Sequence, residues 1–393
     1  MHGPRGAAMA AVLLVSLSLQ QQAAARSWQV GQDGMGDFSV IQDAVDAAAS
    51  GDTIRIGPGR YDDGETITTP GWTEFVRVVV RQEELTIIGA GNGSTIIGPD
   101  DPWSLSDGDN RGIEYGTWWG NERLSISGIQ FENMAFAING APGSELIVGD
   151  CSFNGNNYSV FSYQGSTKIY SSTFEFMPRD GAMVHSHSDS SLLVQDCRFR
   201  LDDVHQWNQK AMHVQNCLNA SIENCSFIDG AFGMQLLGVP VAEVENCSLT
   251  GQSDRAIVCM GGNFSISDCI MENLEYGVFV SSPHSNISMH GTSMFDVAQA
   301  SFLFDTIGEV TVNDCILAKG ATCTVWQFLC AKDDELPHLD FTNNDWGTSC
   351  ADSIAAWISV CDYVVDYVPF QGQSVPAESA SFGDVKAMYL GER

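Results

Sequence analysis

A short phrase of apolar and polar positions recurs along the middle of the chain. It reads aliphatic residue, any residue, Asn or Asp, Cys, any residue, apolar residue. It occurs six times, at residues 148–153, 194–199, 222–227, 244–249, 266–271 and 312–317. Degenerate copies lie around Ile129, Ser172, Thr292 and Asn344, so the repeat has a period near 22 residues. A fixed period of this length with strand-like phrases predicts a solenoid.

Each repeat also contains a second apolar phrase, for example at residues 182–185, 211–214, 233–236, 256–259 and 277–280. These phrases are short and rich in β-forming residues, so we expect strands. No amphipathic helix fits between them, which excludes leucine-rich and ankyrin-type repeats. The pattern predicts a coil of short parallel strands, in which each side chain stacks on its equivalent about 4.8 Å along the axis.

The Asn or Asp of the first phrase is expected at a sharp bend, because these residues tolerate a left-handed backbone. The column is Asp150, Asp196, Asn224, Asn246, Asp268 and Asp314. The following Cys is expected to face inward and pack as a small hydrophobic residue. Stacked cysteines are close enough for disulfides, but we predict a column of buried thiols. The better disulfide candidates are Cys323, Cys330, Cys350 and Cys361, near the C-terminal end.

The first 25 residues have the features of a cleaved signal peptide. Arg5 precedes an apolar run from about residue 7 to 19, and residues 23–25 are all Ala. The run is shorter than the roughly 20 residues that cross a bilayer. The sequence therefore predicts a secreted or cell-surface protein without a transmembrane segment.

The repeat defines one domain over residues 26–370, followed by a linker and C-terminal tail at 371–393. An open end of the coil would expose strand edges. Residues 39–49 form an amphipathic pattern and are predicted to cap the first rung as a short helix. Residues 352–359 are predicted to cap the last rung in the same way.

The charge of the chain excludes some partners. It has 18 basic and 49 acidic residues, a formal charge of −31, and 44% hydrophobic residues. Such a surface repels nucleic acid and anionic membranes, and it meets a polyanion only with bridging cations. The hydrophobic content is that of a globular protein. We expect a monomer.

Three stretches resemble a known family. Residues 30–61, VGQDGMGDFSVIQDAVDAAASGDTIRIGPGRY, resemble the opening of pectin lyase-like right-handed β-helix proteins, especially pectinesterases, and so do residues 85–98. The ending NNDWGTSC…VVDYVPF, within 343–370, is similar to the closing segment of bacterial secreted β-helix repeat proteins. The resemblance implies an all-β, single-stranded right-handed parallel β-helix. With the repeat, it predicts about 10 to 12 rungs over roughly 50 Å.

The resemblance does not extend to the catalytic motifs of these enzymes. The nearest match to the nucleophile strand of pectinesterases is residues 230–238, where Gly233 stands about where the nucleophilic Asp would be. Only Asp202-Asp203 resembles any part of the polygalacturonase series, and the pectate lyase motifs are absent. Pectinesterase activity is therefore not expected, and this fold hosts lyases, hydrolases, epimerases and non-enzymes.

Two long loops interrupt the regular repeat, at residues 98–120 and 200–210. Long loops on a regular scaffold tend to carry function. The resemblance places the groove of this fold along the outer face of the strand that follows the Cys phrase, beside the loop before it. The candidate catalytic residues are Asp202, Asp203, Arg255, Lys210 and His213. The candidate substrate-binding residues are Trp207, His205, Gln235, Asp180, Arg179, Trp118 and Trp119.

These residue types suggest particular roles. Arg255, Lys210 or His213 can serve as a base or neutralise an oxyanion. Trp207 can stack on a sugar ring. Asp202 and Asp203 can bind Ca²⁺, which prefers carboxylate oxygens and would let an acidic protein approach an acidic polysaccharide. Ca²⁺ is the candidate cofactor.

Strand parity makes further predictions about side-chain direction. His213 and Gln235 should point outward, while Met212, Val214, Met234 and Leu236 point inward. His185 aligns with inward positions, so we expect a buried, hydrogen-bonded histidine. His185 and His187 have no further ligands nearby in sequence, and zinc is not expected.

Two classes of function remain open. One is a secreted protein that binds, and cleaves or modifies, an extracellular pectin- or uronate-like polysaccharide; as an enzyme it would be a lyase or a glycoside hydrolase. The other is a non-catalytic cell-surface scaffold or adhesion module, with residues 200–210 as a solvated structural loop. Carboxylates converging with Arg, Lys or His beside Trp207 would favour the first class.

Overall fold

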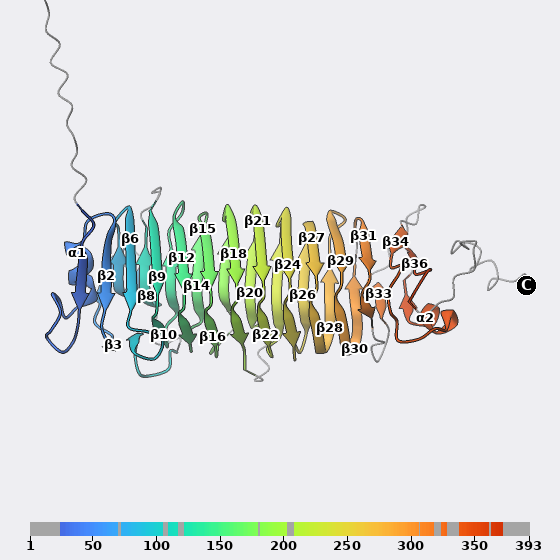
Figure 1. Cartoon of the computed structure of the whole chain (residues 1–393), viewed down its shortest axis with the longest axis horizontal. Helices are drawn as coiled ribbons and strands as arrows, with labels where there is room; N and C mark the ends of the chain where they lie inside the picture. Colours follow the sequence, from blue (N-terminus) through green and yellow to red (C-terminus); the bar gives the residue numbers. More distant parts are fainter. Residues whose placement is uncertain are drawn as a thin grey trace, which may run out of the picture.

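The structure is a computed structural model that describes residues 24–69, 72–104, 109–116, 122–179, 181–202, 208–305, 307–317, 324–327, 338–360 and 363–371. Within these ranges the chain is a right-handed parallel β-helix of about 13 turns with very few helices (Figure 1). The predicted fold is confirmed. The turn count exceeds the predicted 10 to 12, because the coil extends to the N-terminal side of Ile129, where the repeated phrase begins.

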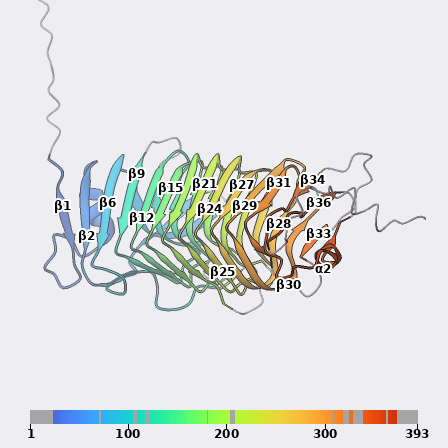
Figure 2. The ribbon, with the colours of Figure 1, turned by 45° about the vertical axis from the view of Figure 1, so that its right-hand side comes forward.

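One face of the coil is a sheet of 14 strands in which consecutive strands pair in parallel (Figure 2). We call it the first sheet. Its strands are β1 (Ser27–Val30), β2 (Asp52–Ile56), β6 (Glu84–Gly89), β9 (Arg123–Ser127), β12 (Glu145–Gly149), β15 (Ser166–Tyr170), β18 (Ser191–Gln195), β21 (Asn219–Glu223), β24 (Val241–Glu245), β27 (Gly262–Ser267), β29 (Ser285–His290), β31 (Val310–Asn313), β34 (His338–Asp340) and β36 (Val364–Asp366).

The other strands form two further faces. The short strands that follow the Cys phrase are β3 (Gly59–Tyr61), β7 (Thr95–Ile97), β10 (Gln130–Glu132), β13 (Ser152–Asn154), β16 (Thr173–Glu175), β19 (Arg198–Arg200), β22 (Ser226–Ile228), β25 (Ser248–Thr250) and β32 (Ile316–Leu317). The long strands are β5 (Trp72–Val80), β8 (Asp109–Tyr115), β11 (Phe136–Gly140), β14 (Tyr158–Tyr163), β17 (Ala182–His187), β20 (Lys210–Gln215), β23 (Phe232–Leu237), β26 (Arg255–Met260), β33 (Val325–Gln327) and β35 (Ile358–Ser359).

Three strands depart from this scheme. The strands β28 (Ile270–Val280) and β30 (Ser293–Phe304) run through the turn, so each contributes to both the short and the long face. The strand β4 (Glu65–Thr69) forms an antiparallel hairpin with β5.

In-register pairing stacks equivalent side chains inside the coil. Five phenylalanines of successive short strands lie face to face, with ring centroids 4.5–5.1 Å apart and planes within 9° of parallel: Phe131, Phe153, Phe174, Phe199 and Phe227. All five are at most 1% exposed. They form a continuous aromatic column along the core.

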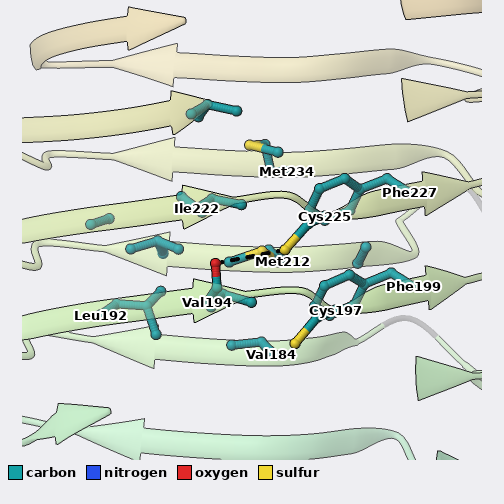
Figure 3. Close-up of a cluster of buried hydrophobic side chains, with 14 of the residues drawn as sticks. Val184, Leu192, Val194, Cys197, Phe199, Met212, Ile222, Cys225, Phe227 and Met234 are labelled. Atoms are coloured by element: carbon teal, nitrogen blue, oxygen red, sulfur yellow. Dashed lines mark hydrogen bonds between the residues drawn. The ribbon is translucent and has the colours of Figure 1, made fainter. Parts of the chain in front are cut away.

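The bend before the short strands has the predicted geometry. The six Asn and Asp residues of the phrase all have φ between 49° and 55°, which is the left-handed region. Each following Cys is buried with a free thiol. The Sγ of Cys225 lies 3.6 Å from the carbonyl oxygen of Val194 (Figure 3). It lies 3.2 Å from the carbonyl oxygen of Glu223, so its single S–H has a backbone acceptor on either side. The prediction of a buried thiol column is confirmed.

The structure describes one of the four cysteines proposed as disulfide candidates near the C-terminal end, and this cysteine forms no disulfide. Cys350 is exposed and carries a free thiol. Cys323, Cys330 and Cys361 lie outside the described residues.

Two short helices cover the ends of the coil (Figure 1). The helix α1 (Ile41–Ala47) buries Ile41, Ala44 and Val45 and packs against β1, β2 and β5. The helix α2 (Ala351–Ala356) buries Ile354 next to β35. Both predicted caps are therefore present. Neither helix, nor any other in the described ranges, is long and apolar enough to cross a membrane.

Replacing a ring in the phenylalanine column should destabilise the fold. Phe199→Ala leaves a cavity between two stacked rings, so we expect a loss of about 3–5 kcal/mol in the free energy of unfolding. Leu218→Ala, at a side chain that is 62% exposed, is the control and should change it by less than about 0.5 kcal/mol. Urea denaturation measures both. Equal losses would show that the column does not stabilise the coil.

The left-handed turn gives a second prediction. At Asn224, with φ of 54°, any Cβ lies close to the following carbonyl oxygen; Asn tolerates this backbone because its short polar side chain can hydrogen-bond locally, Ala has no such group, and Gly has no Cβ. We expect Asn224→Ala to lower the free energy of unfolding by roughly 1–2 kcal/mol and Asn224→Gly to change it less. The same urea titration ranks the two variants. An Ala variant as stable as the Gly variant would contradict a strained turn.

Candidate functional site

The outer face of the long strands presents a row of side chains that are brought into register from distant parts of the chain. We call it the long-strand face. His213 of β20 pairs with Gln235 of β23, and both are half-buried on this face. Their neighbours Met212, Val214, Met234 and Leu236 are fully buried. The predicted directions of these six side chains are confirmed.

The predicted direction of the His185 side chain is wrong. It was predicted to point into the core, but it pairs with His213 and lies half-buried on the long-strand face. Alignment of the apolar phrases matches Met183 with Met212. The structure instead pairs Val184 with Met212, and a slip of one residue turns a side chain to the opposite face.

The histidines continue a run of aromatic rings on this face. Phe161 stacks on His185 with centroids 4.8 Å apart, and His185 lies 4.8 Å from His213. Further rings pair as Phe136 with Tyr158 at 4.9 Å and Tyr163 with His187 at 5.2 Å. Because the rings stack on one another along the coil axis, the run presents ring edges and polar tips to solvent.

Burial keeps the two central histidines neutral. It is the main cause that lowers the pKa of His185 to about 3, and the neighbouring His213 adds to the effect. Burial also lowers the pKa of His213, although hydrogen bonds with Gln235 and Gln215 oppose the shift. The Nδ1 of His213 lies 3.1 Å from Oε1 of Gln235. A neutral His213 has the protonation state that a base requires.

The cations of this face are held by nearby groups. Lys210 Nζ donates to the carbonyl and the side-chain oxygen of Asn208, at 2.9 and 2.7 Å. Arg255 pairs with Asp254 at 3.2 Å, and its guanidinium lies 4.5 Å from the centroid of Phe279. The two cations belong to one column, in which Phe232 separates them.

A groove of about 660 Å³ lies beside Arg255, at the turns between the short and long strands. It crosses several rungs in which this turn is short: residues 229–231 join β22 to β23, and 251–254 join β25 to β26. The preceding connection, residues 201–209, is longer. The polar lining residues are Gln252, Ser253, Asp254, Asn273, Glu275 and Asp296, and the apolar ones include Ala231, Leu274 and Ala298.

The carboxylates of the groove differ in environment. Asp254 is half-buried, and its pKa is raised, first by burial and then by Glu275, while Arg255 opposes the shift. Glu275 is half-buried and Asp296 is exposed. The groove therefore holds a carboxyl group with a raised pKa beside a second carboxylate, an arrangement that can exchange a proton with a ligand.

The structure brings together only part of the predicted site. Arg255, Lys210, His213 and Gln235 share the long-strand face, and Arg179 is exposed at the turn before β17. Asp202 is half-buried at the end of a described range. Asp203, His205, Trp207, Asp180, Trp118 and Trp119 lie outside the described residues.

No metal site is evident in the described part of the chain. It contains no group of three or more His, Cys, Asp or Glu side chains suitably placed for a metal ion. The Ca²⁺ hypothesis for Asp202 and Asp203 stays a prediction, because Asp203 is not among the described residues.

The surroundings of Gly233 determine whether a nucleophilic Asp fits at this position of the chain. It is buried, and a Cβ placed there would lie 2.6 Å from the carbonyl oxygen of Ala256 and 2.9 Å from Leu249. The position faces the core and has no room for a nucleophilic carboxylate.

Glu275 and Asp296 were not among the residues predicted from the sequence. They lie within the continuous strands β28 and β30, whereas most of the predicted candidates lie in or next to the long loops. A usable signal existed: the turn residues Gly251, Asn273 and Asp296 are 22 and 23 positions apart, one repeat each, and all have positive φ.

Comparison with known families agrees on the fold. The family profile of the right-handed beta helix region matches residues 203–345. The catalytic domain of a GH87 α-1,3-glucanase is similar at 10% identity and a TM-score of 0.40, over 88% of this chain and 69% of that chain. The A-module of mannuronan C-5 epimerase AlgE6 from Azotobacter vinelandii is similar at 13% identity and a TM-score of 0.29, over 86% and 94%. No curated protein matches the sequence significantly.

The histidine environment predicts a pH dependence. The unfolded chain binds a proton on His185 near the ordinary pKa of 6.5, whereas the folded chain does so only near 3. The free energy of unfolding should therefore fall as the pH drops from about 6.5 towards 3. In His185→Phe, the decrease in the free energy of unfolding that His185 causes over this pH range should be absent. Urea denaturation across this range, with an NMR titration of His185, tests the expectation. A measured pKa near 6.5 would contradict it.

Proposed function

We propose that this chain is a secreted β-helix protein that binds an extracellular polysaccharide in the groove at Asp254, with the chain of sugars running along the coil axis. The observation that carries the proposal is the groove itself. Its volume of about 660 Å³ lies in the range of small-molecule sites, and its wall mixes carboxylates, amides and apolar side chains. Sugars present the same mixture of hydroxyl groups and apolar C–H faces.

The geometry of the coil suits a polymer. Equivalent turns repeat at each rung, about 4.8 Å apart, so a chain parallel to the axis meets equivalent turn positions one after another. Gly251, Asn273 and Asp296 are three such equivalents, and all line the groove. The neighbouring long-strand face, with Gln235 and His213, offers further hydrogen-bonding groups to a ligand that extends beyond the groove.

Two features support chemistry in addition to binding. Asp254 has a raised pKa and can donate a proton to a leaving group, and Glu275 beside it can act as a base. Ca²⁺ held by Asp202 and Asp203 would add a Lewis acid at the neighbouring turn. Without such chemistry, the groove is that of a binding or adhesion module.

An activity and retention screen tests the proposal. The mature protein is offered uronate-rich, neutral and amino-sugar polysaccharides, with and without Ca²⁺. We expect retention of at least one class. Glu275→Gln should weaken binding about tenfold or more, because hydrogen bonds to a charged group contribute roughly 1.5–3 kcal/mol. Asp196→Asn, at an exposed turn residue on another edge of the coil, is the control.

The products separate the mechanisms. Unsaturated products that absorb in the ultraviolet indicate a lyase, and new reducing ends alone indicate a hydrolase. Either activity should disappear in Asp254→Asn. Retention without products identifies a binding module. Neither retention nor products on any polysaccharide would overturn the proposal in favour of a structural scaffold.

A further inference from the structure

The polar groups of the groove are mainly hydrogen-bond acceptors. Asp254, Glu275 and Asp296 contribute carboxylates, which accept and do not donate when ionised. The hydroxyl of Ser253 already donates to the carbonyl of Gly230 at 3.3 Å. Only the amide of Asn273 offers an uncommitted donor among these polar side chains. A ligand that forms hydrogen bonds with these acceptors must itself supply hydrogen-bond donors.

The amide of Gln252 adds to this imbalance. The residue is 1% exposed, and its Nε2 donates to the carbonyls of Phe227, Asp229 and Thr250 at 3.1–3.2 Å. If the amide were flipped, Oε1 would face these three carbonyl oxygens, so the orientation of the amide is fixed. Its Oε1 has no hydrogen-bond partner among the described residues. The equivalent Asn156 accepts from the backbone N–H of Met134 at 3.1 Å, whereas the Oε1 of Gln209, at the same turn of an earlier rung, is also without a partner among the described residues.

The charge of the groove is negative. Its three carboxylates face one nearby cation, Arg255, so the formal sum is −3 + 1 = −2. Arg255 is already paired with Asp254 and packed on Phe279. Glu275 and Asp296 have no ion pair within the described part of the chain. A uronate would bring a further carboxylate to a wall that repels it.

We infer that the groove selects a polymer of amino sugars whose free amines are protonated, and that it discriminates against uronates. The inference rests on the proposed function and names the substrate class of the same site. A protonated amine supplies three donors and a positive charge, which complements Glu275, Asp296 and the acceptors between them. Acetylation of that amine removes the charge and two of the three donors.

The test compares three oligosaccharides of equal length by isothermal titration calorimetry: glucosamine, N-acetylglucosamine and galacturonate oligomers. We expect the glucosamine oligomer to bind roughly tenfold more tightly than its acetylated counterpart, with a difference that shrinks as ionic strength rises. Galacturonate should bind most weakly. Glu275→Gln/Asp296→Asn should bring the affinities for the glucosamine and acetylated oligomers to within about threefold.

The control variant has the same net charge as Glu275→Gln/Asp296→Asn. Asp196→Asn/Asp268→Asn removes two exposed carboxylates at the other turn, where Asn adopts the left-handed backbone as Asp does. It should keep the preference for the free amine, and if it loses the preference too, the effect is one of overall charge and the inference is wrong. Circular dichroism confirms that both double variants are folded.

The outcomes separate this inference from the proposal on which it rests. Equal binding of the free and acetylated oligomers, or tighter binding of galacturonate, overturns the inference and leaves polysaccharide binding intact. Binding of none of the three, together with no retention in the wider screen, overturns both.

Discussion

The architecture depends on in-register stacking of each residue on its equivalent one turn later. Parallel pairing holds successive turns about 4.8 Å apart, and from β9 to β32 the bend between the first sheet and the short strands, with its left-handed residue, keeps the same length of two residues. Because of this stacking, each core position of the repeat forms a column of equivalent side chains along the coil. The phenylalanines from Phe131 to Phe227 form one such column, and the thiols from Cys197 to Cys269 form another.

The same constraint makes the candidate site. The regular bend between the first sheet and the short strands leaves the other bend, before the long strands, free to vary in length. Where that bend is short, in the rungs of β23 to β30, the surface is hollowed into the groove. Asp254, Glu275 and Asp296 are about one repeat apart in sequence and become neighbours because each turn returns the chain to the same edge.

Charge and burial then decide what the site can do. The formal charge of −31 makes cations scarce, and Lys210 and Arg255 of the long-strand face are engaged by Asn208 and Asp254. Burial lowers the pKa values of His185 and His213, so these rings add no charge near neutral pH. Burial raises the pKa of Asp254, and the ion pair with Arg255 opposes the shift. The result is an acceptor-rich, negatively charged groove next to a neutral aromatic face.

The sequence by itself determined the coil, its period, the left-handed turn at Asn224 and its equivalents, and the outward direction of His213. Each of these follows from local pattern, since a repeated phrase must repeat its backbone and its inward side. Only the tertiary structure decided that His185 stacks on His213 and that Glu275 and Asp296 join Asp254 in one groove. These depend on the register between strands some 22 residues apart. A one-residue slip in that register reverses a side chain, and the sequence pattern alone does not fix it.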